Sequence, residues 1–171
     1  MSAKATSKSI SFSGISLILG VICAFIKLIS VVISGSPFEM IHKLDPNGII
    51  PSVWIWNLCG IILYFLAGCA AGIAVNETNS KRLCGTKEAS AYKVGLFFIS
   101  LLFLGILHYP LFFVCERLLI SLLVAVISVI CSVMCAVLWS KISSFAALIM
   151  TSFAFYSVYV AFINICILMS N

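Results

Sequence analysis

Charged side chains are scarce in this chain of 171 residues: they make up 9% of it, whereas hydrophobic residues make up 63%. Soluble domains carry about 25% charged residues, because their surfaces face water. A water-exposed surface built from the present composition would aggregate, which excludes a soluble globular protein. We therefore expect an integral membrane protein whose main partner is the lipid bilayer.

Strand-like stretches of alternating polar and apolar residues are also missing, which excludes a membrane β-barrel. The chain contains five apolar runs of about 20 residues, the length that a helix needs to cross a bilayer. They cover residues 10–33, 53–75, 94–114, 118–139 and 145–169. The first run is too long for the core of a signal peptide, so we interpret it as a retained helix. The predicted fold class is an all-α membrane protein, with one bundle of five transmembrane helices over residues 10–171.

Basic residues are few and unevenly distributed between the loops, which indicates the orientation. If the chain crosses the membrane five times, seven basic residues lie on the side of the N-terminal tail: Lys4, Lys8, Lys81, Arg82, Lys87, Lys93 and Lys141. Only Lys43 and Arg117 lie on the other side. Because positively charged loops stay inside, residues 1–9 are expected to be a cytosolic tail and the C terminus to lie outside. We expect the cell membrane in a bacterium or the mitochondrial outer membrane in a eukaryote. The basic residues form no patch, so no nucleic acid is expected as a partner.

Acidic residues are missing from the interior of the spans, where a proton-coupled antiporter normally keeps a carboxylate. A disulfide framework is missing too, because seven of the eight cysteines lie in or at the ends of spans. Cys131 and Cys135 are one helical turn apart, but that span contains no histidine or carboxylate. We therefore expect packing residues there and no metal site.

Small and polar residues follow one face of three predicted helices, at about 100° per residue. In lipid, such residues belong at helix–helix contacts. The predicted interior faces are Ser16, Gly20, Cys23, Lys27, Ser30 and Ser34; Trp54, Asn57, Tyr64, Gly68 and Gly72; and Ser121, Ala125, Ser128, Ser132, Cys135 and Trp139. Gly68 and Gly72 form a GxxxG pattern, which favours either close packing within one chain or a homodimer contact.

Lys27 lies within the first span, six residues before its predicted end at residue 33. One interpretation is that its ammonium group snorkels to the membrane interface. The other is that it acts as a counter-ion for an acidic group of a ligand.

Three stretches of the chain resemble one family of membrane proteins. The last span and its flanks read "ISSFAALIMTSFAFYSVYVAFINICILMSN", the third span ends in "PLFFVCER", and the second begins in "DPNGIIPSVWIWNLCGIILYFLAG". They are similar to helices five, three and two of the translocator protein/tryptophan-rich sensory protein (TspO/MBR) family. The resemblance covers about residues 40–171, and the long first loop and short later turns agree with it.

The chain departs from that family in its tryptophans, of which it has only three. His108 replaces the tryptophan expected before the proline of helix three, and Cys59 or Gly60 replaces the one expected on helix two. Ile165 and Met169 stand where animal members carry their cholesterol motif, so cholesterol binding is not expected. The chain is thus identified as a divergent, tryptophan-poor member of the family.

The resemblance implies a cavity in the bundle that binds a flat hydrophobic ligand, a tetrapyrrole of the porphyrin or haem type, with no cofactor required. Flat faces for it would come from Trp54, Trp56, Tyr64, Tyr109, Phe112, Tyr156 and Tyr159. Polar anchors would be Lys27, Asn57, His108 and Asn164. For His108, a hydrogen bond across helices, a polar ligand contact and axial ligation of haem all stay open. On the last span, Ser152, Tyr156 and Tyr159 lie within about 60° of one another and form the face expected toward the cavity, whereas Phe153, about 100° from Ser152, is expected to face away.

The implied role is that of a sensor, carrier or scavenger. An enzyme that degrades porphyrin through an aromatic radical is disfavoured, because the tryptophans that would carry the radical are mostly absent, and we assign no catalytic residue. The other alternative is an unrelated small multi-pass transporter or membrane assembly subunit.

The predicted orientation can be tested by cysteine labelling in sealed cells. A membrane-impermeant thiol reagent should reach a cysteine introduced at Asn47, in the first loop, and should miss native Cys84 in the second loop. Labelling of Cys84 in intact cells would invert the topology.

Overall fold

The computed structural model describes residues 14–34, 52–82 and 89–170. Within these ranges the chain forms the helices α1 (Gly14–Ile33), α3 (Val53–Arg82), α4 (Ala89–Phe113), α5 (Leu118–Ser140) and α6 (Ser144–Ser170). Each is long and apolar enough to cross a bilayer, which confirms the predicted fold class. The predicted tail of residues 1–9 and the start of the first predicted span lie outside the described residues.

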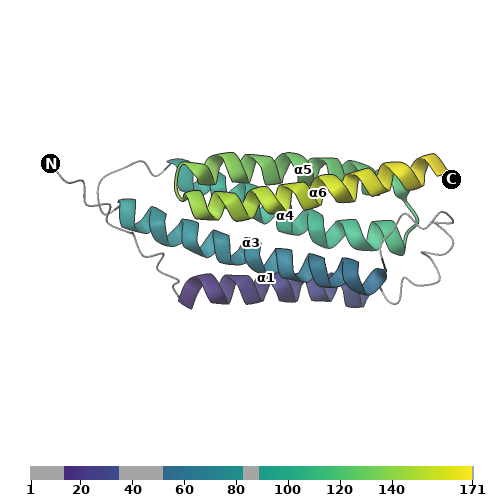
Figure 1. Cartoon of the computed structure of the whole chain (residues 1–171), viewed down its shortest axis with the longest axis horizontal. Helices are drawn as coiled ribbons and strands as arrows, with labels where there is room; N and C mark the ends of the chain where they lie inside the picture. The colour runs from purple at the N-terminus through teal and green to yellow at the C-terminus, as the bar shows by residue number, and fades with distance from the viewer. Residues whose placement is uncertain (1–13, 35–51, 83–88, 171) are drawn as a thin grey trace, which may run out of the picture.

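The five helices lie side by side along one common direction (Figure 1). Their contacts form a ring in which α1 packs on α3, α3 on α6, α6 on α5, α5 on α4 and α4 on α1. The turns on either side of α5 are short, so α4, α5 and α6 form the antiparallel stack that short turns impose. The ring encloses one interior, which residues from every helix can reach.

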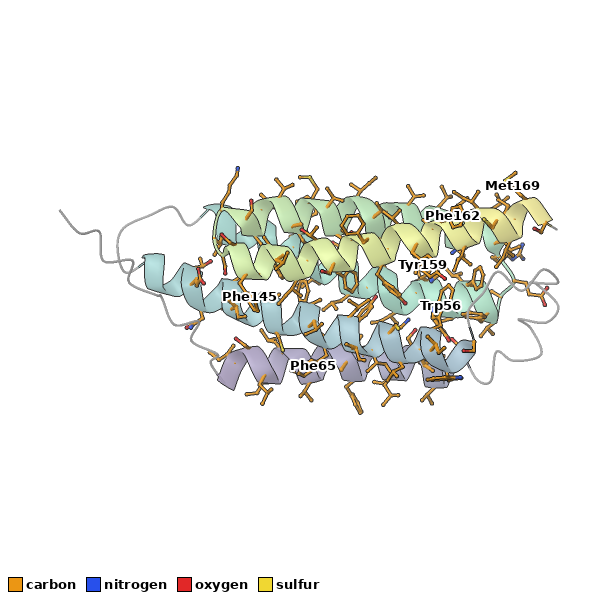
Figure 2. All side chains as sticks on the ribbon, in the orientation of Figure 1. Trp56, Phe65, Phe145, Tyr159, Phe162 and Met169 are labelled. Atoms are coloured by element: carbon orange, nitrogen blue, oxygen red, sulfur yellow. The ribbon has the colours of Figure 1, made fainter. Side chains whose placement is uncertain are left out.

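Large apolar side chains cover the outside of the ring. Phe155 and Met169, for example, are 73% and 83% exposed, and Figure 2 shows Met169 projecting away from the other helices. Such a surface would associate in water but matches the hydrocarbon chains of lipids. The protein is therefore a multi-pass integral membrane protein.

The interior faces predicted for the first and fourth spans are confirmed. The buried residues of α1 are Ser16, Gly20, Cys23, Lys27 and Ser30. In α5, Ser121, Ala125, Ser132, Cys135 and Trp139 are buried, and Ser128 is half-buried. Both helices face lipid over much of their surface, so one stripe of small and polar residues is enough to define their inner side.

Gly68 and Gly72 of α3 pack against α1 of the same chain. A Cβ atom added to Gly68 would overlap the backbone of Leu19 and Gly20, and one added to Gly72 would overlap the backbone of Ser16. The missing side chains let the two helices approach closely. The alternative that this face forms a homodimer contact is therefore wrong, because α1 already covers it.

Pro110 lies inside α4, where it has no N–H to donate to the carbonyl oxygen of Ile106, four residues earlier. The hydroxyl of Ser30 in α1 donates to that oxygen at 3.1 Å. A neighbouring helix thus satisfies the acceptor that proline leaves free, as a membrane helix requires. The bond also ties α1 to α4.

Leucine at either glycine of the GxxxG pattern should disrupt the fold. In Gly68→Leu and Gly72→Leu the new side chain meets backbone atoms of α1, which cannot move aside, so we expect a loss of stability of about 3 kcal/mol or failure to fold. Gly14→Leu is the matched control, since nothing lies within 4 Å of a Cβ atom there. Thermal unfolding in detergent measures the loss. A stable, folded monomer from either variant would contradict the intramolecular contact.

Removal of the Ser30 hydroxyl should leave the Ile106 carbonyl unpaired. Hydrogen bonds between membrane helices contribute about 0.6 to 1.7 kcal/mol, so we expect Ser30→Ala to lower the free energy of unfolding by about 1 kcal/mol. In a Pro110→Ala background the restored N–H of residue 110 can pair with the Ile106 carbonyl. Ser30→Ala should then lower the free energy of unfolding by less. A double-mutant cycle in reversible unfolding measures this difference. Equal costs in the two backgrounds would show that the bond does not compensate for the proline.

Candidate ligand cavity

A small cavity inside the ring is lined by residues from all five helices. Its walls are formed by Lys27, Trp56, Tyr64, Leu101, Gly105, His108, Ala125, Ser128, Phe153, Tyr156, Ser157 and Val160. It lies toward the half of the bundle in which α3 begins, where Figure 2 shows Trp56. Its volume is about 40 Å³, whereas one water molecule needs roughly 10–15 Å³ of such space.

Lys27 brings a charged group to this cavity. Its side chain is 5% exposed, and its Nζ lies 4.3 Å from the ring centroid of Tyr109 and 5.6 Å from that of Tyr64. Both distances are within the range of cation–π attraction. The interpretation that Lys27 snorkels to the interface is therefore wrong, because the tyrosine rings hold the ammonium group in the interior.

Aromatic rings form much of the wall. The rings of Tyr64 and Phe153 meet edge to face with centroids 5.2 Å apart, and those of Phe153 and Tyr156 are 6.2 Å apart. Tyr64 can lie against α4 only because residue 105 is glycine: a Cβ atom on Gly105 would overlap the Tyr64 hydroxyl. The cavity therefore has flat apolar faces with hydroxyl groups at their edges.

His108 is held by a chain of hydrogen bonds that crosses three helices. The Ser121 hydroxyl of α5 donates to Oδ1 of Asn164 in α6 at 2.9 Å. The amide Nδ2 of Asn164 then donates to the Val160 carbonyl oxygen at 2.8 Å and to Nε2 of His108 at 3.1 Å. The interpretation that His108 hydrogen-bonds across helices is confirmed. Because Nε2 already accepts a hydrogen bond, it is not free to ligate a haem iron.

The residues predicted to contact a ligand fall into three groups. The first group lines the cavity and consists of Lys27, Trp56, Tyr64, His108 and Tyr156. The second group does not border the cavity but lies behind the lining residues or next to them; it consists of Asn57, Tyr109, Phe112 and Asn164. Trp54 and Tyr159 are exposed on the outside of the bundle.

The residues behind the lining support the residues that line the cavity. The Tyr109 hydroxyl donates to Oδ1 of Asn57, which fixes the ring that carries the Lys27 ammonium. Phe112 is stacked on His108 with ring centroids 5.9 Å apart. These residues therefore orient the polar groups of the cavity without touching its space.

Trp54 and Trp56 cannot both face the cavity. Residues two apart in a helix point about 200° away from each other. Trp56 is buried, with its ring centroid 6.4 Å from that of Phe113, whereas Trp54 is 68% exposed. The expectation that Trp54 lies on the interior face of α3 is wrong.

Phe153 lines the cavity, so the expectation that it faces away is wrong as well. The inner face of α6 includes Phe153, Ser157, Val160 and Asn164, whereas Ser152 is exposed. The predicted face is thus rotated by one residue, which is about 100° around the helix. This rotation also explains why Tyr159 lies at the outer surface beside Trp56, at 6.3 Å between ring centroids.

The other lining residues that sequence reasoning did not assign to the site are small or aliphatic: Leu101, Gly105, Ala125, Ser128, Ser157 and Val160. Residues of these types occur along every membrane helix, so their spacing alone does not single them out. Only Ala125 and Ser128 carried a signal, as members of a predicted interior face.

A second, larger cavity of about 330 Å³ lies between α1, α3 and α4, with Trp139 near the end of α5 in its wall. No charged residue lines it among those that the structure describes, and some of its lining residues, such as Ile22 and Ile99, also face lipid. Ligand sites combine apolar walls with a few convergent polar groups that fix orientation. The smaller cavity has these groups, an ammonium, an imidazole and two tyrosines, and is therefore the candidate site.

A ring of five transmembrane helices around a cavity with a buried lysine defines a small integral membrane protein with an interior cavity. The chain belongs to the TspO/MBR family, whose sequence model matches residues 14–169. Comparison with curated proteins and with solved structures finds no match. The resemblance found in the sequence is confirmed, and the alternative of an unrelated transporter or assembly subunit is wrong.

Proposed function

We propose that this member of the TspO/MBR family binds a flat hydrophobic ligand with a carboxylate group, a tetrapyrrole of the porphyrin or haem type, inside the bundle. Its role would be that of a sensor, carrier or scavenger of this ligand. The observation that carries the proposal is the ammonium group of Lys27, buried in the membrane interior beside aromatic rings.

The energetics of Lys27 favour an anionic ligand. Burial of an ammonium group in apolar surroundings is costly, and a cation–π contact returns only about 2 kcal/mol. A carboxylate beside Nζ would neutralise the charge where the low dielectric constant makes the attraction strong. Haem-type tetrapyrroles carry such groups as propionates, and their flat rings match the faces of Tyr64, Phe153 and Tyr156.

Binding of a tetrapyrrole requires the cavity to widen. Its volume of about 40 Å³ is far below the roughly 300–1,000 Å³ of small-molecule pockets. Tyr156 lines the cavity but is only half-buried, and Tyr159 is exposed beside Trp56. Rotation of these rings would open the cavity between α3 and α6. In this proposal the described structure is the closed form of the site.

The anchor of the ligand in this proposal is a carboxylate and not an iron atom, because Nε2 of His108 already accepts a hydrogen bond from Asn164. Metal-free protoporphyrin and haem should therefore bind with similar affinity. Degradation through a tryptophan radical is not favoured, since Trp56 is the one tryptophan in the lining.

Titration of the purified protein with protoporphyrin IX, followed by fluorescence, tests the site. Loss of one stacking ring costs about 1 kcal/mol, so we expect Trp56→Ala and Tyr156→Ala to weaken binding several-fold. Lys27→Met should weaken it about tenfold or more, because it removes a charge-assisted hydrogen bond. Trp54→Ala is the matched control: it removes the same ring from the outer face and should leave the affinity unchanged.

The dimethyl ester of protoporphyrin separates the role of charge from that of stacking. Lys27→Met and the wild type should bind this ester equally well, whereas Trp56→Ala should bind it more weakly. If monodisperse wild-type protein binds no protoporphyrin, the tetrapyrrole assignment fails. If it binds but Lys27 and Trp56 have no influence, the ligand lies elsewhere in the bundle.

A further inference from the structure

Two nitrogen-bearing side chains border the small cavity from neighbouring helices, Lys27 of α1 and His108 of α4. They are 5% and 7% exposed, so each is more than nine-tenths buried. A volume of about 40 Å³ has room for a small polar group such as a carboxylate. A carboxylate placed there would meet both side chains at once.

The hydrogen bonds behind His108 decide what its ring offers to the cavity. Nε2 accepts a hydrogen bond from Nδ2 of Asn164, and a neutral imidazole carries one hydrogen, which must then be on Nδ1. No acceptor for this Nδ1–H is found among the described residues. Phe112, stacked on the imidazole at an interplanar angle of 13°, fixes the plane of the ring. His108 therefore presents an oriented donor.

We propose that Nδ1–H of His108 and the ammonium group of Lys27 together bind one carboxylate of the ligand. Ser121 and Asn164 are the positioning residues that hold the donor tautomer of His108. The proposal rests on the proposed function for the identity of the ligand, and it names the group that the site recognises.

The two donors have complementary roles. The ammonium group of Lys27 is a point charge with rotatable donors, so it supplies attraction but little direction. The neutral imidazole of His108 supplies direction and adds no second positive charge to the apolar interior. One ammonium and one carboxylate then neutralise each other, with a further hydrogen bond from the imidazole, as a buried ion pair requires.

This donor set also determines specificity. A carboxylate only accepts hydrogen bonds, whereas a primary amide or a protonated acid brings donors of its own. Donors of an amide or a protonated acid would meet the donors of Lys27 and His108, which is unfavourable in a closed site. An ester brings no donor, but it lacks the negative charge that pairs with the ammonium group of Lys27. The site should therefore select ionised acids over their esters and amides.

NMR of the protein with isotopically labelled histidine nitrogens tests the tautomer directly, because the chain contains only two histidines, His42 and His108. The spectrum of His108→Asn assigns the signals. We expect His108 to be in the Nδ1–H form in the absence of ligand. We also expect acetate, the carboxylate probe, to shift its Nδ1 signal in the wild type and not in Lys27→Met. A ring in the Nε2–H form, or an Nδ1 signal that acetate leaves unmoved, would overturn the inference.

Two amide variants distinguish the two ring nitrogens. The amide nitrogen of His108→Asn takes the place of Nδ1, and that of His108→Gln takes the place of Nε2. We expect His108→Asn to bind protoporphyrin within about twofold of the wild type and His108→Gln to bind it about tenfold more weakly, the effect of one lost hydrogen bond to a charged group. The dimethyl ester should bind to both variants equally.

The outcomes separate this inference from the proposed function. If the wild type binds no protoporphyrin but acetate still shifts the Nδ1 signal, the tetrapyrrole assignment fails and the carboxylate site stands. If protoporphyrin binds and both amide variants bind it alike, the role of Nδ1–H fails and the proposed function stands. Thermal unfolding checks the fold of the variants, and the wild-type spectrum decides the tautomer even if a variant is unstable.

Discussion

The absence of water inside a bilayer governs this structure, because a polar group buried between the helices can find a partner only within the bundle. The carbonyl that Pro110 leaves unpaired is bonded by Ser30 from the next helix. Asn164, fully buried, uses its amide oxygen for Ser121 and its amide nitrogen for Val160 and His108. These polar residues thus connect the helices to one another, and the bonds of Asn164 orient His108 at the cavity.

Close packing of α1 on α3 explains why a charge lies in the interior. The glycines at 68 and 72 allow the backbones to approach, and α1 then turns its whole small and polar face toward the ring. Lys27 is part of that face, so it is carried inward with its neighbours, where Tyr109 and Tyr64 receive the ammonium group. The residues that pack α1 on α3 and the charge that borders the cavity therefore belong to one stripe of α1.

The candidate site brings several polar groups together around a small cavity. Its charge, imidazole and tyrosines converge on about 40 Å³, whereas no charged residue within the described part of the chain borders the larger cavity near Trp139. In a membrane protein, a large apolar cavity is readily filled by lipid, but a buried ammonium group has no such ready partner. The polar groups around a cavity therefore identify the candidate site better than the volume of the cavity does. In the proposed function, rotation of aromatic side chains would make room for a larger ligand.

The sequence by itself determined the membrane class and the five helices, because the bilayer sets the composition and the length of the apolar runs. It also determined the inner faces of α1 and α5, because each of these two helices carries one clear stripe of small and polar residues. It also indicated five residues that line the cavity: Lys27, Trp56, Tyr64, His108 and Tyr156. Only the tertiary structure decided the inner face of α6 and the side of α3 on which each tryptophan lies; the other predicted inner residues of α3 are buried or half-buried. Both helices are apolar nearly all round, and α3 packs on α1 as well as α6, so their composition does not fix their rotation. A rotation of one residue, about 100°, exchanges Ser152 for Phe153, and the two tryptophans at 54 and 56 lie on opposite sides of α3. Contacts between helices set that rotation, and they are not written in the pattern of any single helix.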